Sequence, residues 1–123
     1  IDDPDFAEKN SEAAKNMDSN EINKLSSHQF TVLLSHRPEY YETYKKTDAN
    51  LVLTGHAHGG QFRLPFIGGI VAPNQGFFPE YDSGVYKEAD FAMVVSRGIG
   101  NSVIPVRINN QPEIVLIELS GRR

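Results

Sequence analysis

The amino-acid sequence predicts an α/β fold built around a strand–helix–strand unit. Residues 30–34 and 51–54 are short apolar runs rich in strand-forming residues, and turn-forming residues end both of them. Between the runs, Pro38 suits the first position of a helix, and the tyrosines that follow it recur at helical spacing. The connection over residues 35–50 is long enough for the crossover that joins two parallel strands.

Composition and charge exclude several classes of protein and of site. With 123 residues, the chain is long enough for one domain with one hydrophobic core. The formal net charge of −4 argues against binding through bulk positive charge, so no nucleic-acid partner is expected. The absence of cysteine excludes disulfide scaffolds, cysteine zinc sites and thiol nucleophiles. No apolar run approaches the roughly 20 residues needed to cross a bilayer.

We interpret the chain as a single partial domain in four parts. These are a helical lead-in over 1–27, a strand–helix–strand unit with histidines over 28–61, a loop region rich in glycine and proline over 62–84, and C-terminal strands over 85–123. The lead-in predicts a helix over 5–17 and then a short helix that buries Ile22 and Leu25. In the last part, strands are expected over 91–95, 104–108 and 114–119.

Three histidines follow the ends of the two central strands. His36 lies two residues beyond the first apolar run, and His56 lies two residues beyond the second. Because parallel neighbours end at the same edge of a sheet, these two side chains should lie side by side. His58 joins them if the loop bends, and the glycines at 55, 59 and 60 tolerate the positive φ that a bend needs. His28 should lie elsewhere.

Neutral imidazole is a common ligand of zinc and other transition metals. The sequence therefore predicts a metal site formed by His36, His56 and His58. The alternative is that these are loop histidines satisfied by ordinary hydrogen bonds. Arg97 follows the strand expected over 91–95 in a glycine-flanked turn, where it either reaches an anionic phosphate or forms a structural salt bridge.

Apolar residues in the glycine- and proline-rich region have two interpretations. Residues 64–67 and 77–79 are expected near the mouth of the site, where they either contact an acyl chain or membrane surface or cap the sheet.

Two motifs, Leu-Leu-Ser-His-Arg-Pro-Glu over 33–39 and Leu-Thr-Gly-His-Ala-His-Gly-Gly-Gln over 53–61, resemble the last two metal motifs of calcineurin-like metallophosphoesterases. Later segments resemble the bacterial YkuE-like branch of that family: Phe-Pro at 78–79, Gly-Val-Tyr at 84–86, Val-Ser-Arg-Gly-Ile-Gly at 95–100 and Pro-Glu-Ile at 112–114. The resemblance covers about residues 28–119.

The resemblance implies a four-layer α/β/β/α sandwich that carries two divalent metal ions of the Mn, Zn or Fe type. An aspartate and a hydroxide or water bridge the ions, and the substrate is a phosphomonoester or phosphodiester. By resemblance, His36 and His56 bind the second metal and His58 binds the first. This chain would be the C-terminal part of the sandwich.

The family's three acidic and asparagine-containing motifs, which precede these histidines, are absent from the chain. We therefore expect a C-terminal fragment with half of the metal ligands, at most one bound ion, no catalytic residue of its own and weak or no activity. Strands cut from their sandwich should also expose an apolar face, so the fragment is expected to self-associate.

Two alternatives from other classes stay open: a complete mononuclear three-histidine zinc enzyme resembling a hydratase, and a noncatalytic interaction module. Metal stoichiometry distinguishes them from the family interpretation. For the compartment, both the bacterial cytoplasm and the cell envelope fit the resemblance.

Overall fold

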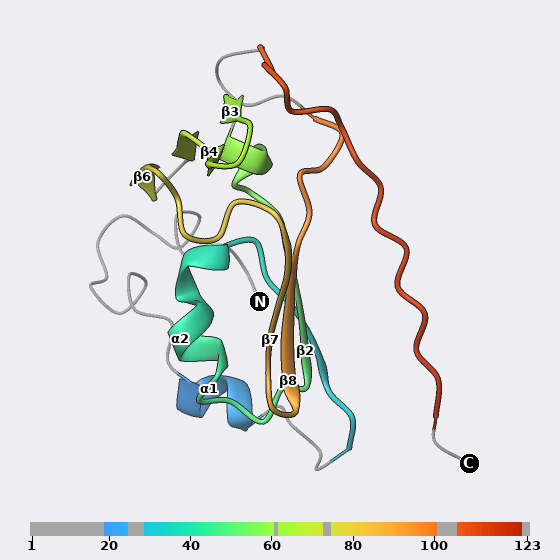
Figure 1. Ribbon diagram of the computed structural model, residues 1–123. Helices are drawn as coiled ribbons and strands as arrows, with labels where there is room; N and C mark the ends of the chain where they lie inside the picture. Colours follow the sequence, from blue (N-terminus) through green and yellow to red (C-terminus); the bar gives the residue numbers. More distant parts are fainter. Residues whose placement is uncertain (1–18, 25–28, 61, 73–74, 101–105, 122–123) are drawn as a thin grey trace.

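The computed structural model describes residues 19–24, 29–60, 62–72, 75–100 and 106–121 (Figure 1). The helix expected over 5–17, together with Leu25 and His28, lies outside the described residues. So does the first half of the strand expected over 104–108.

A four-stranded mixed sheet forms the centre of the molecule, in the order β1-β2-β8-β7. Its strands are β1 (Val32–Leu34), β2 (Leu51–Thr54), β7 (Gly84–Glu88) and β8 (Phe91–Val95). β1 pairs with β2 in parallel, as the sequence predicts, and β8 extends the parallel set on the other side of β2. β7 returns antiparallel to β8. The prediction of an α/β fold is thereby confirmed, while the second sheet of a four-layer sandwich is not seen among the described residues.

One face of the sheet packs against the helices. Leu33, Val52 and Met93 lie in register across three strands and are buried on this face. They share a core cluster with Ile22 and Tyr44. Ile22 comes from α1 (Ser19–Asn23) and Tyr44 from α2 (Tyr41–Tyr44), which directly follows η2 (Pro38–Tyr40). In Figure 1 these helical segments lie on one side of the sheet. The crossover between β1 and β2 is therefore helical, but in two short turns.

Tyr44 fixes this crossover to the end of β1. Its hydroxyl donates to the Arg37 carbonyl at 2.6 Å and lies 2.7 Å from Ser35 Oγ. The side chain is fully buried, and burial raises the pKa of the Tyr44 phenol, so the group remains a neutral donor. Tyr44 thus binds the side chain of Ser35 and the backbone of Arg37, the two residues that flank His36.

The opposite face of the sheet carries a second apolar row. Leu34, Leu53, Val94 and Val85 lie in register across all four strands and point away from the helices. Leu34 is 62% exposed and Val85 is 65% exposed. We call these four residues the outer row.

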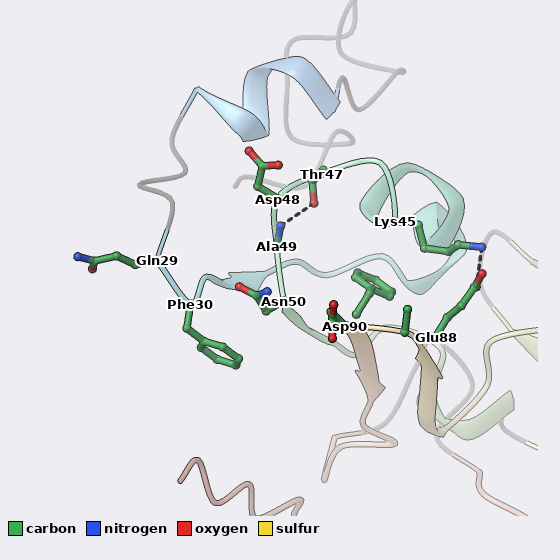
Figure 2. A pocket seen from close by; sticks show the side chains of 11 residues that line it. Gln29, Phe30, Lys45, Thr47, Asp48, Ala49, Asn50, Glu88 and Asp90 are labelled. Atoms are coloured by element: carbon green, nitrogen blue, oxygen red, sulfur yellow. Dashed lines mark hydrogen bonds and ion pairs between the residues drawn. The ribbon is translucent and has the colours of Figure 1, made fainter. Parts of the chain in front are cut away.

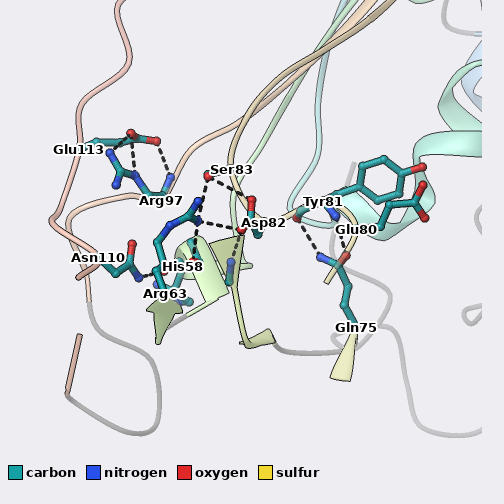
Figure 3. A network of polar contacts seen from close by, with 12 residues as sticks. His58, Arg63, Gln75, Glu80, Tyr81, Asp82, Ser83, Arg97, Asn110 and Glu113 are labelled. Atoms are coloured by element: carbon teal, nitrogen blue, oxygen red, sulfur yellow. Dashed lines mark hydrogen bonds and ion pairs between the residues drawn. The ribbon is translucent and has the colours of Figure 1, made fainter. Parts of the chain in front are cut away.

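Beyond the carboxyl ends of β2 and β8, the chain forms one short turn and two small hairpins. Their elements are η3 (His58–Gly60), β3 (Arg63–Leu64), β4 (Gly68–Gly69), β5 (Val71–Ala72) and β6 (Gly76–Phe77). Asp82 ties the first hairpin together, because its Oδ2 accepts from the Gly69 backbone N–H at 2.6 Å and from Arg63 Nη1 at 2.8 Å (Figure 3). Arg63 Nη1 also donates to the Gly59 carbonyl at 2.9 Å. The hairpin is therefore anchored to the histidine turn.

The prediction of a strand over 114–119 is wrong for this structure. Residues 109–121 carry no strand assignment, and the nearest ladder contact is a single parallel bridge between Phe62 and Ile108. The segment has the right side-chain pattern, but no described strand lies beside it to complete a ladder. Ile114 and Leu116 consequently remain about nine-tenths exposed, at 88% and 93%. Among the described helices, none has the length and apolar character to cross a membrane.

Candidate metal centre

The three parallel strands β1, β2 and β8 end together at one edge of the sheet. The parallel ladders continue one residue past the strands, since the Ser35 N–H donates to the Leu53 carbonyl at 3.0 Å and the Ser96 N–H donates to the Thr54 carbonyl at 2.9 Å. His36, His56 and Arg97 follow these paired positions directly or within two residues. Three of the candidate site residues, His36, His56 and Arg97, therefore lie at the same edge of the sheet.

His36 and His56 are in direct contact. His36 Nε2 and His56 Nδ1 lie 2.7 Å apart, and the ring centroids are 4.4 Å apart with an interplanar angle of 63°. The prediction that these two residues meet across the sheet edge is confirmed. Two imidazole nitrogens bound to one ion at about 2.0–2.1 Å each lie roughly 3 Å apart, so the pair needs little adjustment to hold a divalent metal. The donor set fits the metal that the resemblance implies.

The histidine loop bends through the histidines themselves. His56 and His58 have φ of 61° and 47°, and Gly59 and Gly60 continue the left-handed run at 68° and 72°. The expectation that Gly55 supplies part of this bend is wrong, because Gly55 is not at positive φ. Left-handed φ costs a residue with a Cβ about 1–2 kcal/mol, and such strain is concentrated at functional sites.

His58 lies on the next turn, η3. Burial, followed by the positive charges of Arg107 and His36, lowers the pKa of His58, although the Gly100 carbonyl opposes this shift. Its ring is therefore held neutral, the form that binds metal. The described part of the chain contains no group of three or more His, Cys, Asp or Glu side chains arranged to hold an ion. His58 as a third ligand stays a prediction.

Asn110 supports the backbone of His58 from a distant part of the chain. Its Nδ2 donates to the His58 carbonyl, and the side chain is almost fully buried (Figure 3). Asn110 belongs to the Asn-Asn-Gln-Pro segment over 109–112, whose composition predicts a turn between the two C-terminal runs. An asparagine in such a turn carries no signal for a distant contact, because its partner depends on the path of the whole C-terminal segment.

Arg97 is engaged by Glu113. Its Nε and Nη2 donate to Glu113 Oε2 at 2.8 and 2.6 Å, and its backbone N–H donates to Oε1 at 2.9 Å (Figure 3). Burial by itself would raise the pKa of Glu113, but the hydrogen bonds from Arg97 outweigh it and lower that pKa. Of the two roles considered for Arg97, the salt bridge is the one seen here. Binding of phosphate by Arg97 is not tested by this arrangement.

An open depression of about 700 Å³ lies at the other end of the strands (Figure 2). Its lining includes Asn50 and Asp90, which directly precede β2 and β8, together with Lys45 and Glu88, which form an ion pair at 2.7 Å. Since it lies at the amino ends of these strands and none of the described histidines lines it, we place the functional site at the opposite edge.

Comparisons with known proteins agree with the histidine motifs. The chain is 39% identical over 102 residues to the metallophosphoesterase YkuE of Bacillus subtilis, an alignment that covers 81% of the chain and 34% of the relative. It is 33% identical over 88 residues to the phosphodiesterase YaeI of Escherichia coli, covering 72% of the chain and 32% of the relative. A metallophosphoesterase of Campylobacter jejuni is 35% identical over 100 residues, covering 80% of the chain and 25% of the relative.

No protein-family model matches the chain. No solved structure matches it either. The chain spans about a third of the length of the first two of these relatives. Relatives from three bacterial species carry the name metallophosphoesterase or phosphodiesterase. The chain belongs to the calcineurin-like metallophosphoesterase family.

Proposed function

We propose that the chain is part of a metal-dependent phosphohydrolase that hydrolyses a phosphomonoester or a phosphodiester. The observation that carries this proposal is the contact between His36 and His56 at the carboxyl edge of the parallel strands. The names of the relatives support the reaction class, and that of YaeI supports a phosphodiester among the substrates.

In this proposal His36 and His56 hold one divalent ion of the Mn, Zn or Fe type, and His58 belongs to a second. Two such ions, when bound, supply a hydroxide at neutral pH and offset the charge of the reacting phosphate. The chain's own residues orient the ligands. Tyr44 fixes the backbone next to His36, and Asn110 fixes the carbonyl of His58.

The histidines by themselves do not balance two divalent charges, because imidazole ligands are neutral. Within the described residues no carboxylate joins them to make a group of three. We therefore expect the 123-residue chain to hold at most one ion and to hydrolyse phosphate esters weakly or not at all. The aspartate and asparagine ligands would come from a part of the sandwich that this sequence does not contain.

The outer row favours that arrangement. Leu34 and Val85 are largely exposed on a sheet face that carries four apolar residues in register. We propose that a second sheet covers this face in the complete four-layer sandwich, and that a second copy covers it when the 123-residue chain is alone.

Contact with lipid is supported by exposed aromatic residues in and next to the small hairpins. Phe66 is fully exposed, and Phe77 and Phe78 are 77% and 65% exposed. In Figure 1 these hairpins lie at the histidine end of the sheet. Exposed aromatic rings beside a phosphoesterase site suit a substrate with an acyl chain or one presented at a membrane surface.

The test measures metal content and hydrolysis together in the longest natural chain that carries this sequence. His56→Ala should lower bound metal and the turnover of a chromogenic phosphodiester in parallel, while Lys87→Gln, an exposed change on β7, should alter neither. Two ions per wild-type chain support the proposal. One ion would indicate the mononuclear zinc enzyme, and none would indicate the interaction module. Full activity in His56→Ala at saturating metal would refute the role of His56.

A further inference from the structure

The guanidinium of Arg107 finds hydrogen-bond acceptors among the described residues for only some of its N–H donors. Its Nη2 donates to the Arg97 carbonyl at 2.9 Å and to the Gly100 carbonyl. Its Nε and Nη1 are shielded from solvent and have no hydrogen-bond partner among the described residues. A guanidinium stays ionised and has only donors, so nitrogens withdrawn from water without an acceptor are energetically costly. Within the ranges that the structure describes, no acceptor serves these two nitrogens.

The guanidinium lies at the histidine edge. Arg107 Nη2 is hydrogen-bonded to the carbonyl of Arg97, and Arg97 packs against Gly59, the residue after His58, where a Cβ would lie 2.7 Å from Arg97 Cγ. Arg107 is therefore a neighbour of a predicted metal ligand, although it comes from the far end of the chain.

No carboxylate neutralises this charge within the described ranges. The ion pairs found there use Arg37, Lys45, Arg63 and Arg97 as their cations, and Arg107 is in none of them. Arg97 is satisfied by Glu113, and its carbonyl serves as a support for Arg107. Of the two arginines beside the histidines, Arg107 is thus the one with donors left for an anion.

We propose that Arg107 binds an oxygen of the substrate's phosphate group, with Nη1 as the principal donor. The inference rests on the proposed function, since it supplies the anion-binding part of the same site. Hydrogen bonds from a guanidinium to phosphate are charge-assisted and strong, and they are strongest where water is excluded. Because Nη1 is now covered, the side chains around it have to shift slightly when phosphate enters.

Inorganic phosphate is the probe for the first experiment, titrated calorimetrically into the metal-free 123-residue chain. Arg107→Gln should weaken phosphate binding about tenfold or more, and Arg107→Lys, which keeps the charge without the planar fork, should weaken it less. Lys87→Gln removes the same charge at an exposed site on β7 and should leave the affinity within about twofold. Circular dichroism checks that each variant folds, and Arg107→Lys serves as the test if Arg107→Gln does not fold.

An affinity for phosphate in Arg107→Gln within twofold of the wild type would overturn the inference. So would equal losses in Arg107→Gln and Lys87→Gln, which would indicate a general effect of charge.

A second experiment separates this inference from the proposed function. In the longest natural chain, Arg107→Gln should raise KM for a chromogenic phosphodiester about tenfold with a smaller effect on kcat, while bound metal stays unchanged. If His56→Ala leaves the metal content intact but phosphate binding still depends on Arg107, the proposed function fails and the anion site stands. If His56→Ala removes the metal and Arg107→Gln changes neither phosphate binding nor KM, only the inference about Arg107 fails.

Discussion

His56 and His58 adopt a backbone conformation that normally favours glycine. Both have positive φ, at 61° and 47°, within a loop where the next two residues are left-handed glycines. This conformation is energetically unfavourable for an L-residue with a Cβ, so the surrounding hydrogen bonds have to maintain it. The Asn110 contact to the His58 carbonyl is one such constraint. We interpret the strain as the cost of directing two imidazoles from adjacent turns toward one edge.

This strain makes a specific prediction about stability without metal. His56→Gly should have a free energy of unfolding about 1 kcal/mol higher than His56→Ala, because both lose the imidazole and only glycine relieves the left-handed φ. Ala57→Gly is the control, since Ala57 is not at positive φ and should lose about 1 kcal/mol instead. Urea denaturation of the metal-free chain measures all three. Equal stability of the two His56 variants would show that the loop is not strained at this position.

At the scale of single residues, the sequence predicts the histidine pair because its cause is simple. Parallel strands end at one edge, and residues at matching offsets meet there. Arg107, Asn110 and Glu113 could not be predicted in the same way. They reach the site through a segment with no regular structure, so their positions depend on tertiary contacts rather than on any periodic pattern.

Among the elements, the turn η3 and the hairpin strand β4 approach each other at backbone distance. A Cβ built on Gly60 would lie 2.5 Å from the Cα of Gly69, closer than real side chains allow. This approach brings the first hairpin against the histidine turn, where the Arg63 contact to the Gly59 carbonyl holds it. Glycine is required at position 60 for space as well as for φ.

Gly60→Ala should therefore destabilise the chain more than Gly76→Ala. Both glycines are left-handed, at 72° and 68°, but a Cβ on Gly76 would meet no atom of the described residues within 4 Å. The strain from φ is then common to both variants, and the difference of about 1–3 kcal/mol reports the clash with β4. Thermal or urea unfolding gives the comparison. Similar losses in the two variants would mean that the hairpin moves away without cost.

The C-terminal segment is held to the sheet edge by the pair of Arg97 and Glu113. The folded pKa of Glu113 is lowered, so the unfolded chain takes up the proton first as the pH falls. The stabilising effect of the pair is fully present above the unfolded pKa, near 4.5, and is lost as the pH falls through the folded pKa.

Glu113→Gln should accordingly lower the free energy of unfolding at pH 7, and the difference from the wild type should shrink as the pH falls from about 5 toward 3. Urea titrations across this range measure it. Glu118→Gln, an exposed change on the same segment, should give no such pH-dependent difference. A difference between Glu113→Gln and the wild type that is constant with pH would show that the ionised pair does not stabilise the fold.

The elements also show where sequence patterns are sufficient. The runs at 51–54 and 91–95 form the strands expected, because neighbouring strands complete their ladders. The run at 114–119 is equally rich in strand-forming residues and is extended, but no described strand pairs with it. A segment with strand propensity forms a strand only where a neighbouring strand completes its backbone hydrogen bonds. The sequence of the segment itself does not specify that neighbour.

For the molecule as a whole, the outer row is the apolar surface of the sheet whose end members have little cover among the described residues. Leu34, Leu53, Val94 and Val85 cross all four strands in register, and the two end members, Leu34 and Val85, are mostly exposed. An apolar face of this kind favours association, and closed pairing of two copies hides the same surface on both. The 123-residue chain should therefore form dimers or larger oligomers at tens of micromolar.

Sedimentation velocity tests this expectation with a matched pair of variants. The double change Leu34→Lys and Val85→Lys places two charges on the outer row and should raise the dissociation constant at least about tenfold, toward a monomer. Phe78→Lys is the control, because Phe78 is equally exposed at 65% but lies on the hairpin side of the molecule. It should leave association unchanged. If Phe78→Lys disrupts the oligomer and the double variant does not, the interface is formed by the hairpin side of the molecule. If the wild-type chain stays monomeric, the outer row does not drive self-association.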